Sequence, residues 1–135
     1  MKPLLIALFA LFALPASAEL AVVAHPKSAL GALTPRQAQD LFLGRTRMLP
    51  NNHSAAPIDQ ASALRGDFYQ KLTGRPLEQI DAYWARLSFT GQASPPRRVE
   101  DDRAVLESVR ENQDAIGYID SEHADSSVRV LLRLP

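Results

Sequence analysis

The stretch Ala56–Phe68 reads APIDQASALRGDF, and it decides which fold class the sequence favours. Its short apolar start suits a strand, the Asp-Gln-Ala-Ser run suits a turn, and a helical pattern then begins at once. Ser62 is a plausible N-cap for that helix, which Gly74 can end. A strand, a tight turn and a helix start in this order leave free backbone amides at the turn, and such amides can hold an anion.

The side chains at this turn allow two interpretations. Amides around Ala63, Leu64 and Arg65 would point outward from the helix start, where the helix dipole also favours negative charge. The Ser62 hydroxyl can donate to a bound oxyanion, and Arg65 can add a charge-assisted bond. A capped helix with an exposed arginine and no ligand explains the same residues. Both interpretations stay open from the residues alone.

Strand and helix patterns alternate along the rest of the chain. The run Thr34-Pro35-Arg36-Gln37 combines three helix-start signals: a threonine cap, a proline at the first helical position and a glutamine three residues after the cap. The alternation predicts a single α/β domain in which helices flank a mixed, at least partly parallel sheet. The predicted strands are 20–24, 56–59, 115–119 and 128–134, and the predicted helices are 35–43, 62–73, a segment from Pro76, and 99–112.

The sequence contains no motif for catalysis, a cofactor or a metal ion. The three histidines lie in predicted loops without the spacing of zinc ligands, and the chain has no cysteine. The acidic run Glu100–Asp102 falls in the first turn of the last predicted helix, where the helix dipole favours carboxylates. This explains the run better than metal binding does. No residue pair nominates a nucleophile with an adjacent base, so we expect a protein that is not an enzyme.

The first 18 residues have the pattern of a secretory signal peptide. Lys2 supplies the positive charge, Leu4–Leu14 is an apolar run of 11 residues, and Ala16-Ser17-Ala18 matches a cleavage site. The apolar run is too short to cross a bilayer, which takes roughly 20 residues. We therefore expect cleavage near Ala18, export to the periplasm, and a single mature domain over 19–135.

Composition limits the class of ligand. Without Lys2, the mature segment has 14 basic residues against 15 acidic ones, a net charge of −1. This balance argues against nucleic acid as a partner, because nucleic-acid-binding domains usually carry a strong basic surplus. Twelve of the 14 basic residues are arginines, whose planar guanidinium suits oxyanions. A solvated surface explains most of these arginines equally well.

Several segments occur in an order that resembles a known family. The segments LAVVAHP, LTPRQAQDLFLGR, PIDQ-x-S-x-x-R-x-x-F, AYWARLSFTG, Pro-Pro and AIGYI span roughly Leu20 to Leu132. Their order and spacing resemble the phosphate-binding-protein-like domains of periplasmic substrate-binding proteins that serve phosphate ABC transporters. Because the chain has residues for only one of that family's two lobes, the resemblance implies a single lobe of a type II periplasmic-binding-protein-like fold.

The resemblance also implies a ligand, phosphate or a similar oxyanion. The family's phosphate loop is typically an arginine followed by Asp-Gly-Ser-Gly-Thr, and its serine aligns with Ser62. Here Ala63 and Leu64 replace the glycine and the threonine and can contribute only amides, and the usual arginine does not occur within 56–59. Arg65 is long enough to compensate from the next turn. The predicted ligand-binding residues are Gln60, Ser62, Ala63, Leu64 and Arg65.

Two functions follow as alternatives. In the first, the protein is a non-enzymatic periplasmic solute-binding module for phosphate or another small oxyanion. One lobe offers only half a cleft, so tight binding would need a partner such as a second copy in a homodimer. In the second, the protein keeps the fold without a ligand and acts as an interaction or sensor module that contacts a membrane transporter or sensor protein.

Overall fold

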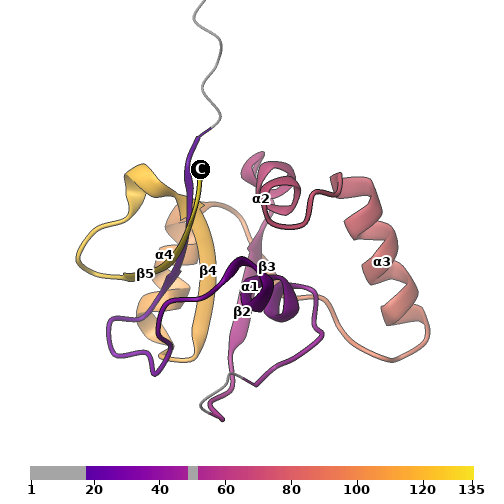
Figure 1. Ribbon diagram of the computed structural model, residues 1–135, viewed down its shortest axis with the longest axis horizontal. Helices are drawn as coiled ribbons and strands as arrows, with labels where there is room; N and C mark the ends of the chain where they lie inside the picture. Colours follow the sequence, from indigo (N-terminus) through magenta and orange to yellow (C-terminus); the bar gives the residue numbers. More distant parts are fainter. Residues whose placement is uncertain (1–17, 49–51) are drawn as a thin grey trace, which may run out of the picture.

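The computed structural model describes residues 18–48 and 52–135, and Figure 1 shows how their helices and strands are arranged. Of the predicted signal peptide, only Ala18 lies within the described residues. None of the helices in these two ranges is long and apolar enough to cross a membrane. The elements in chain order are β1 (Leu20–Ala24), α1 (Pro35–Phe42), β2 (Ala56–Gln60), α2 (Leu64–Thr73), α3 (Leu77–Phe89), β3 (Arg97–Val99), α4 (Asp102–Glu111), β4 (Ala115–Asp120), the 3-10 helix η1 (Ser121–His123) and β5 (Arg129–Leu134).

The strands form one mixed sheet in the order β3-β2-β4-β1-β5. β1 runs antiparallel to β4 and β5, whereas β2 runs parallel to β3 and β4. The predicted α/β class and the mixed, partly parallel sheet are therefore confirmed. Because β2, β3 and β4 run the same way, the segments that follow them leave the sheet at the same edge, where ligands bind in open α/β sheets.

Helices cover both faces of this sheet. Successive side chains of a strand point to opposite faces, and on β1 both sets are apolar and need cover. On β1, Leu20, Val22 and Ala24 belong to the core cluster that includes the buried residues of α1, α2 and α3. Ala21 and Val23 belong to the cluster that includes the buried residues of α4. In Figure 1, α3 lies at the outer end of the molecule beside α2, far from β5. The arrangement is a three-layer α/β/α sandwich.

Close packing of α4 on the sheet depends on Gly117 in β4. A Cβ atom built at Gly117 would lie 2.5 Å from Val105 Cγ1 on α4 and 3.7 Å from the Ile58 carbonyl oxygen of β2. A side chain here would force Val105 or the helix that carries it to shift. Glycine therefore lets α4 lie directly over β2 and β4, near the edge where these strands end.

The helix-start signals before α1 are confirmed. The Thr34 hydroxyl accepts a hydrogen bond from the Gln37 amide at 3.2 Å, and the Gln37 side chain accepts one from the Thr34 amide at 2.9 Å. Pro35 occupies the first helical position, as its fixed φ angle favours. This pair of reciprocal bonds satisfies two amide groups that the helix itself cannot, and so sets where α1 begins.

The last predicted helix begins later than expected. Val99 belongs to β3, a strand of three residues that pairs in parallel with the end of β2. α4 then begins at Asp102, and its N-cap Asp101 accepts a hydrogen bond from the Ala104 amide at 3.0 Å. The prediction of a helix from 99 was wrong because β3 is too short to show alternation, and pairing with β2 determines its conformation.

The start of α2 is also displaced from the prediction. α2 begins at Leu64 with Ala63 as its N-cap, so the assignment of Ser62 as N-cap was wrong by one residue. The Ser62 hydroxyl oxygen still accepts a hydrogen bond from the Leu64 amide at 3.2 Å, and its carbonyl accepts one from the Arg65 amide at 3.1 Å. Ser62 thus supports the helix start from outside the helix. Gly74 ends α2 as predicted, with a left-handed φ of 73°.

Candidate functional site

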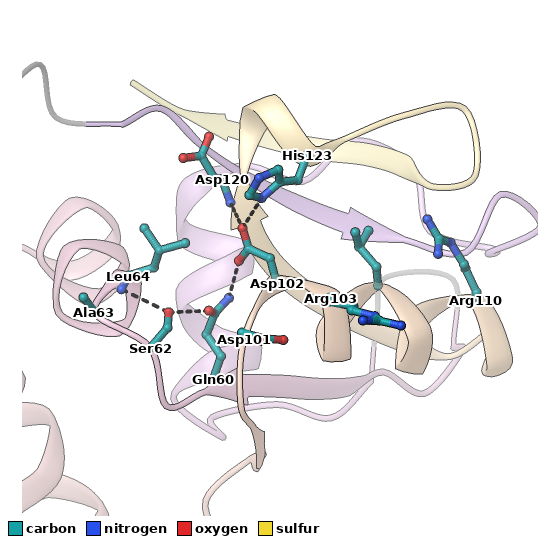
Figure 2. Close-up of a pocket in the computed structure, with 11 residues that line it drawn as sticks. Gln60, Ser62, Ala63, Leu64, Asp101, Asp102, Arg103, Arg110, Asp120 and His123 are labelled. Atoms are coloured by element: carbon teal, nitrogen blue, oxygen red, sulfur yellow. Dashed lines mark hydrogen bonds and ion pairs between the residues drawn. The ribbon is translucent and has the colours of Figure 1, made fainter.

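A cavity of about 640 Å³ opens at the carboxyl ends of β2 and β4. These strands pair only near their starts, at Ala56 with Ala115 and at Pro57 with Ile116. Beyond these pairs β2 follows β3, and β4 follows β1. The end of β2 with the turn after it, the length of α4, and the end of β4 with η1 line the cavity (Figure 2). The lining residues are Gln60, Ser62, Ala63, Leu64, Asp101, Asp102, Arg103, Leu106, Arg110, Asp120 and His123.

Gln60 bridges the gap where the two strands diverge. Its side-chain Nε2 donates to the Tyr118 carbonyl on β4 at 2.8 Å and to Asp102 Oδ1 on α4 at 2.9 Å. Its Oε1 accepts the hydroxyl hydrogen of Ser62. Both amide hydrogens of the buried Gln60 side chain are therefore in use. Gln60 holds the base of the cavity together and has no spare donor for a ligand.

Residues at two helix starts line the same cavity, and some of their backbone amides have no protein acceptor. At α2, the N–H groups of Ser62 and Ala63 donate to no acceptor among residues 18–48 and 52–135. At α4, the same is true of the N–H groups of Asp102 and Arg103. The first amides of a helix have no partner within the helix, and the dipole gives that end a partial positive charge. Two helix starts thus offer four donors around one cavity.

Asp102 connects these features. Its Oδ1 accepts from Gln60, while its Oδ2 accepts from the Asp120 amide at 3.0 Å and lies 2.6 Å from His123 Nδ1. Figure 2 shows the resulting chain of interactions from Ser62 through Gln60 and Asp102 to His123. The Asp102 side chain is nearly buried, whereas the His123 side chain is 59% exposed. The hydrogen bond to Asp102, helped by neighbouring carboxylates, raises the pKa of His123 above its ordinary value.

The remaining charged groups of the cavity lie toward its rim. Asp101 caps α4, and Asp120 accepts a hydrogen bond from the Glu122 amide at 3.0 Å. Arg103 is highly exposed and forms only a loose pair with Glu107 on its own helix. The acidic side chains lining the cavity thus have protein donors of their own, and Arg103 leaves positive charge at the rim.

A buried ion pair on β2 supports the turn from the other side. Asp59 Oδ2 accepts from Arg65 Nε at 3.1 Å and from the Tyr69 hydroxyl at 3.0 Å, and Asp59 Oδ1 accepts from the Tyr118 hydroxyl. Arg65 also donates to Asp81 on α3 at 2.8 Å. The side chains of Arg65 and Asp59 are 7% and 3% exposed. This network ties β2 to α2, α3 and β4.

Each donor in this network keeps its proton at ordinary pH. Burial and the charge of Asp59 raise the pKa of the Tyr69 and Tyr118 hydroxyls well above their usual range. Burial alone would lower the pKa of Arg65, but the hydrogen bond to Asp81 and the charge of Asp59 raise it overall. The Asp59 carboxylate is therefore surrounded by permanent donors.

The structure brings most of the predicted ligand-binding residues together. Arg65 is not part of the cavity lining, and its guanidinium is directed to two carboxylates instead. The Ser62 hydroxyl hydrogen is donated to Gln60, so the serine must rotate before it can donate to a ligand. The predicted residues that line the cavity are Gln60, Ser62, Ala63 and Leu64.

The sequence did not point to Asp102 or His123 as cavity residues. The helix dipole accounts for the acidic run at 100–102, and the sequence around His123 predicts a loop. One signal was available for His123: it follows the predicted strand 115–119, and parallel strands of one sheet end at the same edge. No such signal existed for Asp102, because β3 was not predicted. Within the described residues, no group of three or more histidine, cysteine or acidic side chains could hold a metal ion.

Comparison with known proteins shows which solved structures share this fold. No protein-family model and no curated protein matches the chain. Solved structures do match 84% of it: an ABC-type phosphate transport receptor from Vibrio cholerae at 19% identity and a TM-score of 0.64, and a putative phosphate ABC transporter substrate-binding protein with bound phosphate from Clostridium perfringens at 19% and 0.67. A possible phosphate binding protein from Planctomyces limnophilus matches over the same share at 14% and 0.56.

These matches extend over less than half of the known structures. The chain covers 46% of the Vibrio protein, 45% of the Clostridium protein and 41% of the Planctomyces protein. It therefore shares the fold of one part of such substrate-binding proteins. At 14–19% identity the similarity establishes the fold and leaves the ligand to be argued from the cavity.

Proposed function

We propose that this protein is a non-enzymatic solute-binding module that holds phosphate or a similar small oxyanion in the cavity between β2 and β4. The observation that carries the proposal is that four residues from two helix starts line one cavity and have backbone amides without a protein acceptor in the described residues. Two helix dipoles add their positive ends at the same place. The fold shared with proteins described as phosphate receptors supports the choice of phosphate.

The aspartates in the cavity are compatible with an anionic ligand. Asp101, Asp102 and Asp120 each accept hydrogen bonds from protein amides, which stabilise their negative charge. The exposed guanidinium of Arg103 and the imidazole of His123 add positive charge at the rim. In this proposal Arg65 has a supporting role, because its buried pairing with Asp59 fixes β2 against α2.

The sequence features at the N-terminus give the proposal a location. A signal peptide cleaved near Ala18 would deliver residues 19–135 to the periplasm, where solutes are captured for transport. A membrane transporter component or a second copy of this chain would then supply the other wall of a closed site. The share of the matching structures that the chain spans, under one half, motivates this part.

Calorimetric titration of the 19–135 protein with inorganic phosphate, at low and high salt, tests the proposal. We expect binding heat and a higher unfolding temperature at millimolar phosphate, with weaker binding at high salt. Absence of both effects at low salt as well as at high salt would overturn it. Sulfate and acetate in parallel titrations would rank the oxyanions.

Ala63→Pro sharpens the test because it removes one of the four amides. Ala63 has a φ of −60°, which matches the proline ring, and its N–H has no protein acceptor to lose. We expect phosphate binding to weaken several-fold. Thr34→Ala is the matched control, since it weakens the start of α1 in another part of the fold and should leave phosphate binding unchanged.

The second candidate is a ligand-free interaction module, and one observation favours it. The Ser62 hydroxyl and both Gln60 amide hydrogens already have protein acceptors, so the side chains of the turn are satisfied without a ligand. This candidate predicts no phosphate heat together with specific capture of a membrane protein from a periplasmic or membrane extract. The titration therefore separates the two functions.

A further inference from the structure

We propose that His123 is a ligand-binding residue of the cavity and that its protonation state sets how tightly an oxyanion is held. This inference rests on the proposed function, because it concerns the same cavity. It adds a residue that lies 61 positions from Ser62 in the sequence and follows a different strand. It also makes binding depend on pH in a defined direction.

The geometry fixes which nitrogen of His123 is available. Nδ1 lies 2.6 Å from Asp102 Oδ2, and Nε2 has no partner among residues 18–48 and 52–135. A carboxylate at this distance requires a hydrogen on Nδ1. The neutral ring therefore carries a bare lone pair on Nε2, whereas the protonated ring carries an N–H donor there. Figure 2 shows the ring at the cavity rim above Asp102.

This change of one proton reverses the interaction with an anion. With neutral His123, the pair that it forms with Asp102 has a net charge of −1, and the Nε2 lone pair repels an oxyanion. With protonated His123, the pair is neutral overall and Nε2 donates a charge-assisted hydrogen bond. His123 lines the same cavity as Ser62 and Ala63, so one bound ligand can lie between the imidazole and the turn after β2.

The groups around His123 favour the protonated form. The hydrogen bond to Asp102 raises the pKa of His123, burial opposes it, and the charges of nearby carboxylates raise the pKa further. The carboxylates nearest the ring come from α4, β4 and η1, and the cations that line the cavity come from α4. The Glu19 carboxylate, before β1, pairs with Arg133, while the Glu19 carbonyl accepts a hydrogen bond from the Ser121 amide of η1. The charged groups facing this region are Asp101, Asp102, Arg103, Arg110, Asp120 and Glu122.

Phosphate titrations of wild type and His123→Gln between pH 5.5 and 9 test the inference. Phosphate itself changes charge in this range, but that change is the same for both proteins and cancels in the ratio of their dissociation constants. We expect His123→Gln to bind about tenfold more weakly than wild type at pH 5.5, the value of one charge-assisted hydrogen bond at an exposed site, and no more weakly than wild type at pH 9. A ratio that stays constant across the range would overturn the inference.

Two further variants keep the result interpretable. His123→Lys retains a cation at every pH tested, so we expect binding to stay tight at pH 9. His25→Gln is the matched control: His25 follows the end of β1, which lies at the opposite sheet edge because β1 is antiparallel to β4. The dissociation constant of His25→Gln for phosphate should equal that of wild type at every pH. Urea unfolding of the same samples shows whether each variant is folded.

The outcomes separate this inference from the proposed function. If wild type shows no phosphate binding at any pH, the proposed function fails, and the role of His123 fails with it. If wild type binds phosphate but His123→Gln binds equally well at pH 5.5, only the inference about His123 fails. A loss in His123→Gln that disappears toward pH 9, together with tight binding by His123→Lys at pH 9, supports both.

Discussion

Replacing Arg65 by methionine tests whether this residue stabilises the fold or contacts the ligand. Methionine keeps most of the length and the apolar stem of arginine but removes the charge and the donors. In the structure, this leaves the buried Asp59 carboxylate without its cation, although the Tyr69 and Tyr118 hydroxyls still donate to it. Removing one partner of a buried ion pair costs about 3–5 kcal/mol. We expect about 3 kcal/mol here because these remaining donors soften the loss.

Urea unfolding followed by tryptophan fluorescence measures this change, since Trp84 is buried in the core. With a slope of about 1.5 kcal/mol per molar urea for a domain of this size, a loss of 3 kcal/mol lowers the midpoint by about 2 M. Asp59→Asn and the double variant complete a thermodynamic cycle. We expect a coupling free energy of about 2 kcal/mol between the two positions, because they are in direct contact.

Arg133→Met is the control, because its side chain is 59% exposed and pairs with Glu19 at the surface. Its effect should stay below about 0.5 kcal/mol. The reasoning is refuted if the free energy of unfolding of Arg65→Met lies within about 1 kcal/mol of the wild-type value. If the same variant also loses phosphate binding, then Arg65 contacts the ligand, as the sequence pattern had led us to expect.

Three further predictions follow from particular contacts. Gly117→Ala should destabilise the fold by about 1–3 kcal/mol in urea, because its Cβ would lie 2.5 Å from Val105 Cγ1, and Gly31→Ala, where no atom lies within 4 Å, should change little. Trp84→Ala should lower the free energy of unfolding by about 3–5 kcal/mol. Trp84→Phe should lower it far less, because the buried Trp84 N–H has no acceptor in the described residues and its removal breaks no hydrogen bond. Similar losses for the two variants would contradict this. Below about pH 6.5, His123→Gln should lower the free energy of unfolding by less than about 1 kcal/mol, because the protonated ring pairs with Asp102 at an exposed site. This loss should vanish as the pH rises through the raised pKa of His123. A loss that grows with pH would be evidence against the contact with Asp102.

Much of the fold was predictable because the signals act over a few residues. The cap at Thr34, the proline after it and the left-handed glycine at 74 each determine a helix end through contacts within four residues. β1 and β4 were recognisable as apolar runs since both are buried on each face. β3 was not recognisable, because its three residues become a strand only through pairing with β2.

The candidate site divides in the same way. Gln60, Ser62, Ala63 and Leu64 are consecutive or nearly so, and the local order of strand, turn and helix was enough to nominate them. The partners of Arg65 were not visible in the sequence, because an arginine after a helix cap looks the same whether it faces solvent or a carboxylate. Burial of Asp59 and the approach of α3 select the ion pair.

The sequence alone thus determined the α/β class and the turn that lines one wall of the cavity, because hydrogen-bond capping and side-chain periodicity are local. Asp102 and His123 form the opposite wall, and they depend on the tertiary structure. They meet because β2 and β4 diverge after two residue pairs, and because Gly117 lets α4 pack against them. Such long-range packing is the sum of many weak contacts across the core, and no short segment of the chain encodes it.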